Sequence, residues 1–242
     1  MGIQYLNRFL REECKESIKI TPLSELSGKK IAVDVSIYLY KYLADDGLIE
    51  NFYLMLSVFR HYNIIPFFVF DGKPPTEKKA LLCKRLEEKK SAQEEYNALK
   101  EQLAKNDGTE IDKQDILATM DTLKKRFITI CKKQINDVKQ LIHACGASYC
   151  DAPSEADELC AKLVLKGKAW ACLSEDMDMF VYGAGRVIRY LSLLNHTAVV
   201  YNMEGILKTL NMSQKEFREI CILSGTDYNM NMGKNDHNLH KH

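Results

Sequence analysis

Short, strongly apolar runs alternate with helix-like segments along much of the chain. The runs at 31–35, 64–70 and 169–173 are nearly continuous in apolar residues. Such runs are typical of strands that are buried on both faces of a parallel sheet. Because a helical pattern over 49–62 separates the first two runs, the order strand, helix, strand predicts an α/β fold. We expect a central, mostly parallel sheet that helices cover on both faces.

A long polar stretch between 73 and 143 interrupts this alternation. Its apolar residues recur in steps of three and four, which predicts two long helices that form a hairpin standing partly clear of the sheet. We therefore predict one core over 1–229 with a helical insertion at about 73–143, and a polar, disordered tail over 230–242. The pattern also predicts a strand near 146–150, a helix ending near 166, a strand pair at 186–191 and 197–201, and helices at 203–210 and 213–223.

Charge is distributed unevenly between the insertion and the rest of the chain. The whole chain carries a net charge of +1, which suggests no overall attraction to nucleic acid or to a membrane. Residues 73–133 hold 15 Lys and Arg against 11 Asp and Glu, a net +4, whereas the remainder holds 19 against 22, a net −3. A basic segment thus accompanies an acidic body.

The eight cysteines indicate the redox state of the protein's compartment rather than a metal or disulfide site. None forms a Cys-x-x-Cys pair, and several occupy apolar positions of predicted elements. Buried free thiols fit this pattern better than a disulfide framework or a zinc site, so we expect a reducing, intracellular location, which in a eukaryote would include the nucleus. No apolar run is long enough to span a bilayer, and the N-terminus lacks the apolar core of a signal peptide, so we expect no membrane association.

Acidic residues follow the predicted strands or begin the predicted helices at several places. In an open α/β sheet the carboxyl ends of parallel strands share one edge, so we expect Asp34, Asp71 and Asp176 to lie close together. In an extended segment a spacing of two places Asp176 and Asp178 on one face. The full candidate set is Asp34, Asp71, Glu155, Asp157, Asp176, Asp178 and Asp227.

Either Asp157 or Glu158 could accompany Glu155 at the start of the helix that begins there. On a helix Glu158 would share a face with Glu155 more readily than Asp157 would, although the first turn need not be fully helical. Ser154 with Asp157 also resembles an ordinary helix cap with an acidic first turn. The residues alone do not decide between these interpretations.

A cluster of carboxylates is unstable without a positive partner, because like charges repel and each is costly to desolvate. Hard divalent cations with oxygen ligands relieve this cost, and Mg²⁺ is the ion that also leaves room for a phosphate. Two such ions about 4 Å apart, Mg²⁺ or alternatively Mn²⁺, would activate a water for phosphodiester hydrolysis. The few His residues and the unpaired cysteines argue against zinc.

The order of six short motifs resembles the flap endonuclease family of structure-specific 5′-nucleases, over about residues 1–229. The motifs are Met1-Gly-Ile-Gln4, Ile31-Ala-Val-Asp34, Val69-Phe-Asp-Gly-Lys-Pro-Pro75, Ala152-Pro-Ser-Glu-Ala-Asp157, Glu175-Asp-Met-Asp178 and Gly225-Thr-Asp-Tyr228. The resemblance implies a PIN-like nuclease core that cuts branched or 5′-flap DNA, as endonuclease and 5′-3′ exonuclease, with two divalent metals. It also implies that all seven candidate acids are metal ligands, with Asp157 rather than Glu158 beside Glu155.

Further roles follow from the resemblance alone. Lys78 and Arg85 match the family's catalytic cations that face the scissile phosphate, where they would neutralise developing charge; the alternative is a solvated basic face. The hairpin of 73–143 corresponds to an arch that confines single-stranded DNA, and its basic charge suits a nucleic-acid backbone. Four positions are expected to bind nucleic acid: Gly2, Tyr40, Lys125 and Arg126.

The chain departs from the family pattern in three regions. The arch is somewhat longer than usual, with a hinge at Gly108. The segment 43–52 is short where relatives usually carry a longer wedge, and 229–234 does not reproduce the Gly-x-Gly turn of their duplex-binding helix–turn–helix. No clamp-binding tail is visible, so we expect no clamp partner through this chain. We also expect a monomer. Two alternatives stay open: an RNA-degrading nuclease of the same fold, and a non-catalytic binder of DNA junctions.

Overall fold

A mixed sheet forms the centre of the protein, whose computed structural model describes residues 3, 5–105 and 110–225. In this part of the chain the sheet has seven strands, in the order β1-β7-β6-β5-β2-β3-β4. Five neighbouring strands pair in parallel and β7 runs antiparallel between β6 and β1. The strands are β1 (Ile18–Pro22), β2 (Lys30–Asp34), β3 (Ile65–Phe70), β4 (Ser148–Asp151), β5 (Ala171–Leu173), β6 (Arg186–Ser192) and β7 (Thr197–Asn202).

Both faces of the sheet are buried, which explains the near-continuous apolar runs. Successive side chains of a strand point to opposite faces. In β2, Ile31 and Val33 pack into one hydrophobic cluster and Ala32 into the other. The neighbouring β3 repeats the alternation, with Phe68 in the first cluster and Val69 in the second. The predicted architecture of a mostly parallel sheet between two helical layers is confirmed.

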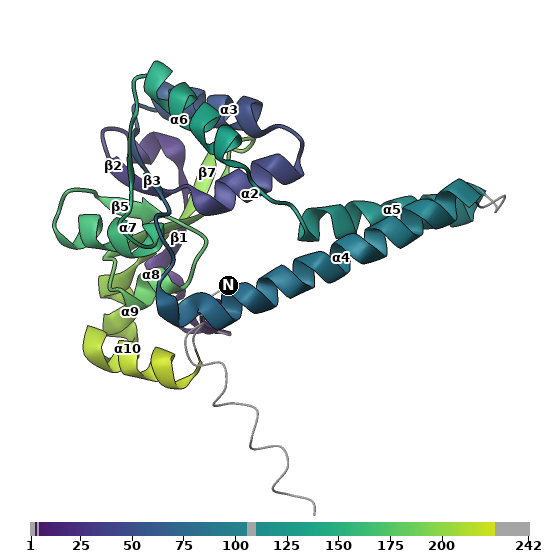
Figure 1. Cartoon of the computed structure of the whole chain (residues 1–242). Coiled ribbons are helices and arrows are strands. Elements are labelled where there is room, and N and C mark those ends of the chain that lie inside the picture. Colours follow the sequence, from purple (N-terminus) through teal and green to yellow (C-terminus); the bar gives the residue numbers. More distant parts are fainter. Residues whose placement is uncertain (1–2, 4, 106–109, 226–242) are drawn as a thin grey trace, which may run out of the picture.

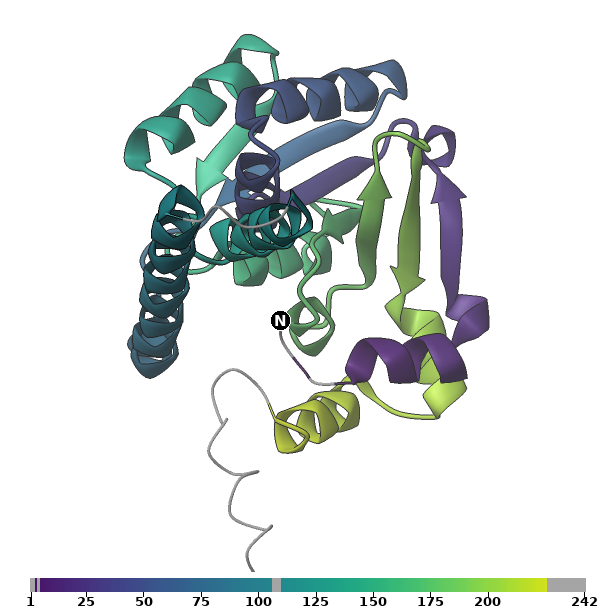
Figure 2. The ribbon, with the colours of Figure 1, turned by 90° about the vertical axis from the view of Figure 1, so that its right-hand side faces the viewer.

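The helices divide between the two faces, as Figure 2 shows from the side of the hairpin. One layer consists of α2 (Ser36–Ala44), α3 (Leu48–His61) and α6 (Lys132–Ala144). The other consists of α1 (Leu6–Glu13), α7 (Ala156–Leu165), α8 (Asp178–Val181), α9 (Met203–Leu210) and α10 (Gln214–Leu223). These helices bury short apolar stripes in the two hydrophobic clusters, and α10 does so by packing against α8.

A helical hairpin projects from the core (Figure 1). It consists of α4 (Lys79–Lys105) and α5 (Glu110–Arg126), and the rings of Tyr96 and Phe127 lie 5.3 Å apart near its base. The expectation of two helices for this stretch is wrong, because the stretch also contains α6. That helix packs on the core through Val138 and Ile142, both fully buried, so the periodic pattern continues after the chain has left the hairpin.

The first thirty residues carry elements that the apolar pattern does not predict. Helix α1 buries only Leu6 and Leu10, and its other positions are polar or exposed, so its apolar stripe is narrow. Strand β1 is an edge strand that pairs with β7, with Ile18 opposite Tyr201. Two 3₁₀ turns, η1 (Lys15–Ser17) and η2 (Leu23–Leu26), connect these elements. Long-range pairing between the two ends of the core determines this region.

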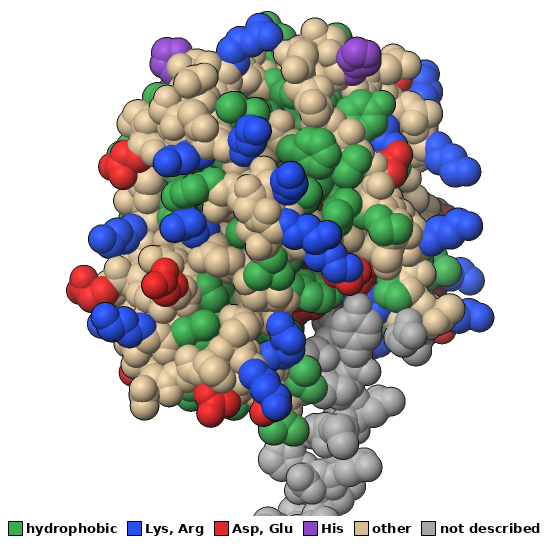
Figure 3. All heavy atoms as spheres, turned by 90° about the vertical axis from the view of Figure 1, so that its left-hand side faces the viewer, with side chains coloured by type: hydrophobic (Ala, Val, Ile, Leu, Met, Phe, Trp, Pro, Cys, Tyr) green, Lys and Arg blue, Asp and Glu red, His purple; other side chains and the backbone are tan. Residues whose placement is uncertain are grey.

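The surface opposite the hairpin is shown in Figure 3, where blue Lys and Arg side chains are more frequent than red acidic ones. All eight cysteines are free thiols, as expected, and Cys14, Cys160, Cys172 and Cys221 are buried. Within the described ranges, no helix combines the length and the apolar content that a membrane span requires.

Candidate metal centre and nucleic-acid interface

Acidic side chains from four loops meet at the carboxyl edge of the parallel strands. Asp34 is the last residue of β2 and Asp71 directly follows β3. Asp176 and Asp178 lie in the loop after β5, at the entry to α8, and Glu155 and Asp157 lie at the start of α7. Because β2, β3 and β5 run in parallel, their ends bring these acids to one place, as the sequence pattern predicts.

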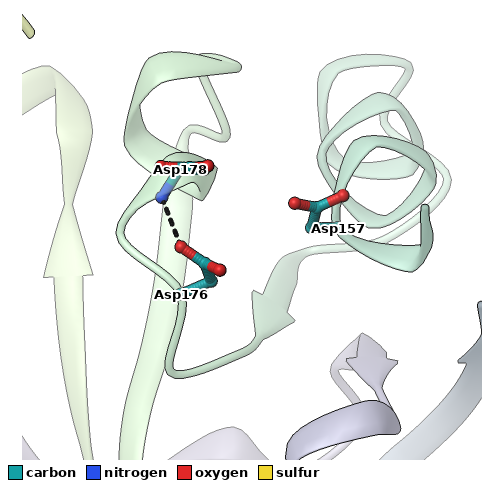
Figure 4. Close-up of side chains that lie close together, drawn as sticks. All are labelled: Asp157, Asp176 and Asp178. Atoms are coloured by element: carbon teal, nitrogen blue, oxygen red, sulfur yellow. Dashed lines mark hydrogen bonds between the residues drawn. The ribbon is translucent and has the colours of Figure 1, made fainter. Parts of the chain in front are cut away.

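Asp157, Asp176 and Asp178 form the tightest group (Figure 4). One carboxylate oxygen from each lies within 4.8 Å of the others, a spacing that could hold a metal ion. The expectation that Asp176 and Asp178 share a face of an extended segment is wrong. Asp178 is instead the first residue of α8, and its backbone N–H donates to Asp176 Oδ1 at 3.0 Å. A turn, not a strand, brings the two carboxylates together.

Asp34 and Asp71 are held by hydrogen bonds from neighbouring loops. Ser174 Oγ donates to Asp34 Oδ2 at 2.8 Å, and the Ser36 backbone N–H donates to Asp34 Oδ1 at 3.2 Å. The Ser36 hydroxyl donates to Asp71 Oδ2, and the Ala156 backbone N–H donates to Asp71 Oδ1 at 2.7 Å. Asp71 therefore accepts a hydrogen bond at the N-terminus of α7, where negative charge is favoured. These contacts give both carboxylates defined positions.

The structure distinguishes the two acids after Glu155. Asp157 is buried and turns toward Asp176 and Asp178. Glu158 pairs with Lys162 at 2.6 Å and is not a member of the group. No side-chain cap hydrogen bond begins α7 within the described residues, so the alternative interpretation of Ser154 and Asp157 as a cap is not supported.

Lys78 brings a positive charge to the same edge. It is the last residue of η3 (Thr76–Lys78), just before α4 rather than within it, and only 8% of its surface is exposed. Its Nζ lies 2.7 Å from Glu155 Oε1. Arg85 lies half-buried on α4. Lys78 thus belongs to the acidic site by contact, while Arg85 lies two turns further along the hairpin.

Gly72 allows two of the acid-bearing loops to touch. Its backbone N–H donates to the carbonyl of Ser154 at 2.7 Å. A Cβ at this position would lie 2.0 Å from the carbonyl oxygen of Ala152, closer than any real contact. Only glycine therefore permits the loop after β3, with Asp71, to lie against the loop after β4, with Glu155.

The electrostatics of the site favour a cation. Burial, and secondarily the charge of Asp71, raises the pKa of Asp34 to about 7. Burial, and secondarily the charge of Glu155, raises the pKa of Asp157 to about 7. The charge of Asp176 contributes to both pKa increases, so the Asp176 carboxylate interacts with Asp34 as well as with Asp157. Buried oxygen donors whose ionised forms are destabilised fit a hard divalent cation, and neither His nor Cys joins the group in the described part of the chain.

A buried arginine, which sequence reasoning missed, positions the loop with Asp176 and Asp178. Arg189 of β6 is 6% exposed, and its Nη2 donates to the carbonyl of Glu175 at 2.9 Å. Its Nε lies 3.4 Å from Glu175 Oε2, and its Nη1 donates to Asn7 Oδ1 of α1 at 2.8 Å. The available signal was a charged residue between Ile188 and Tyr190, inside a predicted strand. A buried arginine with several acceptors is a strong local tether.

The base of the hairpin contacts α2 at two points. Lys89 Nζ lies 5.0 Å from the centre of the Tyr40 ring and donates to the carbonyl of Ile128 at 2.8 Å. Lys124 Nζ lies 2.9 Å from Asp46 Oδ2, just after α2. Tyr40 is 46% exposed, so part of its ring is available at the entrance beneath the hairpin. An exposed aromatic beside basic residues is a typical contact for single-stranded nucleic acid.

The remaining candidates are less closely connected to the acids. Lys125 is exposed at the end of α5 and pairs with Asp121 at 3.0 Å, and Arg126 is exposed beside it. Neither makes a described contact with the acidic group. Gly2 and Asp227 lie outside the described residues, as does the predicted tail over 230–242.

Comparisons with known proteins agree with this arrangement. The XPG N-terminal domain matches residues 1–92 and the XPG I-region matches residues 146–227. Flap endonuclease 1 of Glossina morsitans morsitans is 32% identical over 246 residues, which cover 94% of this chain and 61% of that protein. Flap endonuclease 1 of Meyerozyma guilliermondii is also 32% identical, with 94% and 63% covered. The chain therefore spans about three fifths of the length of these relatives.

Solved structures give the same result at the level of fold. Flap endonuclease-1 from Methanococcus jannaschii superposes with a TM-score of 0.63 at 27% identity, over 94% of this chain and 71% of that one. The catalytic core of Rad2 in complex with DNA substrate superposes with a TM-score of 0.68 at 22% identity, over 94% and 63%. From the two matched domains, the relatives and the shared fold, we conclude that the chain belongs to the flap endonuclease family.

Proposed function

We propose that this protein is a structure-specific 5′-nuclease that hydrolyses phosphodiester bonds in branched or 5′-flap DNA with two divalent ions, Mg²⁺ in the first instance. The observation that carries the proposal is the cluster of Asp157, Asp176 and Asp178 at the edge of the sheet where Asp34, Asp71 and Glu155 also lie, next to Lys78 at the start of the hairpin. Related solved structures support the substrate class, since the catalytic core of Rad2 is in complex with a DNA substrate and human GEN1 with Holliday junction DNA.

The acidic residues would hold the ions in two neighbouring positions. Asp157, Asp176 and Asp178 would bind one ion, and Asp34 and Asp71 would complete the second position across Asp176. Divalent ions at such a site activate the attacking water and neutralise charge on the phosphate when bound. Ser36, Ser174 and the N-terminus of α7 would keep the carboxylates in place before any ion arrives, which limits the reorganisation that binding requires.

Lys78 and the hairpin would act on the substrate. Lys78, held at 2.7 Å from Glu155, would release part of this contact to a phosphate oxygen and stabilise the negative charge that develops there. Arg85 would assist from α4. Tyr40, partly exposed beside Lys89, would stack on a base near the scissile bond, while Lys125 and Arg126 would contact the backbone of a single strand.

Cleavage of a 5′-labelled DNA flap tests the proposal. Protein with a native N-terminus is assayed in Mg²⁺, in Mn²⁺ and in EDTA, together with the variants Asp176→Asn and Asp157→Asn. We expect cutting near the junction in either metal, none in EDTA, and a loss of at least about a thousandfold in each variant, since each removes a ligand from the tightest group. Glu158→Gln is the matched control, because Glu158 is adjacent in sequence but pairs with Lys162, and it should retain activity.

The other outcomes distinguish the alternatives. Strong cleavage of a matched linear RNA without cleavage of the DNA flap would replace the substrate class while keeping the site. Tight binding of the flap without cleavage in either metal, by folded protein, would indicate a non-catalytic junction binder. Activity lost in Glu158→Gln but kept in Asp157→Asn would overturn the assignment of the acidic group itself.

A further inference from the structure

A hollow lies at the edge of the sheet opposite the acidic site, where the parallel strands begin. It has a volume of about 610 Å³ and lies between the loops that precede β2, β5 and β6. We propose that this hollow binds an acidic peptide segment of a partner protein, one that carries apolar side chains among its carboxylates. The inference goes beyond the proposed nuclease function and does not depend on it.

Four basic side chains line this hollow, and no acidic residue of the described part of the chain does. They are Lys29, Lys30, Lys168 and Arg186. Among the described residues, none of the four forms an ion pair with a carboxylate, although the chain carries nearly equal numbers of acidic and basic residues. The face that contains the starts of these strands is the one opposite the hairpin, where Lys and Arg predominate (Figure 3). Such a concentration of one sign of charge favours a partner of the opposite sign.

The centre of the hollow is apolar and contains the single tryptophan of the chain. Trp170 is half-exposed, and Leu165 beside it is 61% exposed. Lys29 Nζ lies 5.5 Å and the Arg186 guanidinium 5.0 Å from the centre of the Trp170 ring. A cation over an indole ring is held in place electrostatically, so these two charges are oriented before a ligand arrives. An exposed tryptophan and arginine together are also typical of the residues that dominate binding energy at interfaces.

This combination selects between anionic ligands. A small anion such as phosphate could pair with the cations, but it would leave Leu165 and the apolar part of the hollow exposed. A nucleic-acid strand would pair with the cations through its phosphates, but its backbone offers no apolar side chain to cover Leu165, which is 61% exposed. A peptide that alternates carboxylates with apolar side chains satisfies both parts, with carboxylates on Lys29, Lys30, Lys168 and Arg186 and an apolar side chain against Leu165 and Trp170.

The position of the hollow makes it compatible with nuclease action. Strand β2 begins at Lys30 and ends at Asp34, so the hollow and the acidic site lie at opposite edges of the same sheet. A peptide in the hollow would therefore leave the edge beneath the hairpin accessible. The surface would recruit a partner while a nucleic acid occupies the other edge.

Trp170 provides a direct test, because it is the only tryptophan in the chain and its fluorescence reports on this hollow. The full-length protein is titrated with a short peptide of glutamates interrupted by leucines, and in parallel with the same peptide carrying glutamines. We expect a saturable change in emission with the acidic peptide only. The double variant Lys29→Glu/Arg186→Glu should weaken its binding by at least about tenfold, while Lys215→Glu, an exposed substitution on α10, should not.

The other probes and variants in this titration can overturn the proposal. An oligothymidylate that competes with the peptide and binds more tightly would make the hollow a nucleic-acid site. An equal response to inorganic phosphate at the same concentration would reduce it to a site for small anions. No response to any probe, or equal binding by wild type and the folded double variant, would remove the site altogether. Unchanged flap cleavage by the double variant would separate the hollow from the nuclease site, and a parallel loss of both would count against a peptide.

Discussion

Asp34→Asn should stabilise the metal-free protein while it removes one of the proposed metal ligands. Asp34 is 8% exposed, and burial together with the charge of Asp71 raises its pKa from an ordinary 3.8 to about 7. The ionised carboxylate is therefore disfavoured in the folded protein when no cation is present. Replacing it with a neutral amide of the same shape removes this cost, because the amide carries no charge to desolvate or repel.

The size of the effect follows from the pKa. At about 1.4 kcal/mol per pKa unit, a rise from 3.8 to about 7 corresponds to about 4 kcal/mol when the group is fully ionised. The amide keeps an acceptor for the Ser36 N–H, but its N–H₂ replaces the acceptor that Ser174 uses, which costs roughly 1 kcal/mol. We expect Asp34→Asn to be about 2–3 kcal/mol more stable than wild type at pH 8 in EDTA.

The pH dependence has a definite sign. The folded pKa of Asp34, about 7, lies above its unfolded pKa, near 4, so the carboxylate costs the fold no stability below pH 4. The free energy of unfolding then falls as the pH rises from about 4 to about 7, and the full loss is present above pH 7. The gain from Asp34→Asn should therefore be largest above pH 7 and less than half as large at pH 5. Urea unfolding in EDTA at pH 5 and pH 8 measures it, with Glu158→Gln as the exposed control. Equal stability of variant and wild type at pH 8, or an equal gain at both pH values, would refute the reasoning.

Three further substitutions test other parts of the structure. Arg189→Met should remove the hydrogen bond to the Glu175 carbonyl and the charge partner of Glu175, whose side chain is 22% exposed, so we expect a loss of stability of about 1–3 kcal/mol and weaker Mn²⁺ binding; unchanged urea unfolding and metal titration would show that Arg189 does not position the loop. Gly72→Ala should lower stability by more than about 2 kcal/mol because its Cβ meets the carbonyl of Ala152, and a thermal melt matching wild type would contradict this. Tyr40→Ala should weaken single-strand binding by about 1–3 kcal/mol while Tyr40→Phe retains it, and equal affinities in fluorescence anisotropy would exclude stacking.

The sheet could be predicted from the sequence because both of its faces are covered. Strands buried on two sides must be apolar at every position, and this makes 31–35 and 64–70 visible without any tertiary information. The placement of Asp34 and Asp71 followed from the same fact, since parallel strands end at one edge. Topology alone thus located most of the acidic site.

Other features depended on contacts between distant segments. Helix α1 has too few apolar positions to be periodic, and β1 becomes a strand only because β7 pairs with it. The boundary between α5 and α6 is invisible to periodicity, since both helices repeat apolar residues every three or four positions. Arg189 has a role only because Asn7 and Glu175, 182 and 14 residues away, offer acceptors. Local pattern contains none of this information.

The site also shows why its acids can be close together without a cation. Each carboxylate of Asp34 and Asp71 accepts two hydrogen bonds from fixed donors, and Asp176 accepts one from the backbone of Asp178. These bonds lower the cost of ionisation, but they do not cancel it, since the pKa of Asp34 and of Asp157 remains near 7. The uncompensated part is the free energy that a bound cation would recover. Stability in the absence of metal and affinity for metal are therefore opposed at the same residues, and a variant that improves one should impair the other.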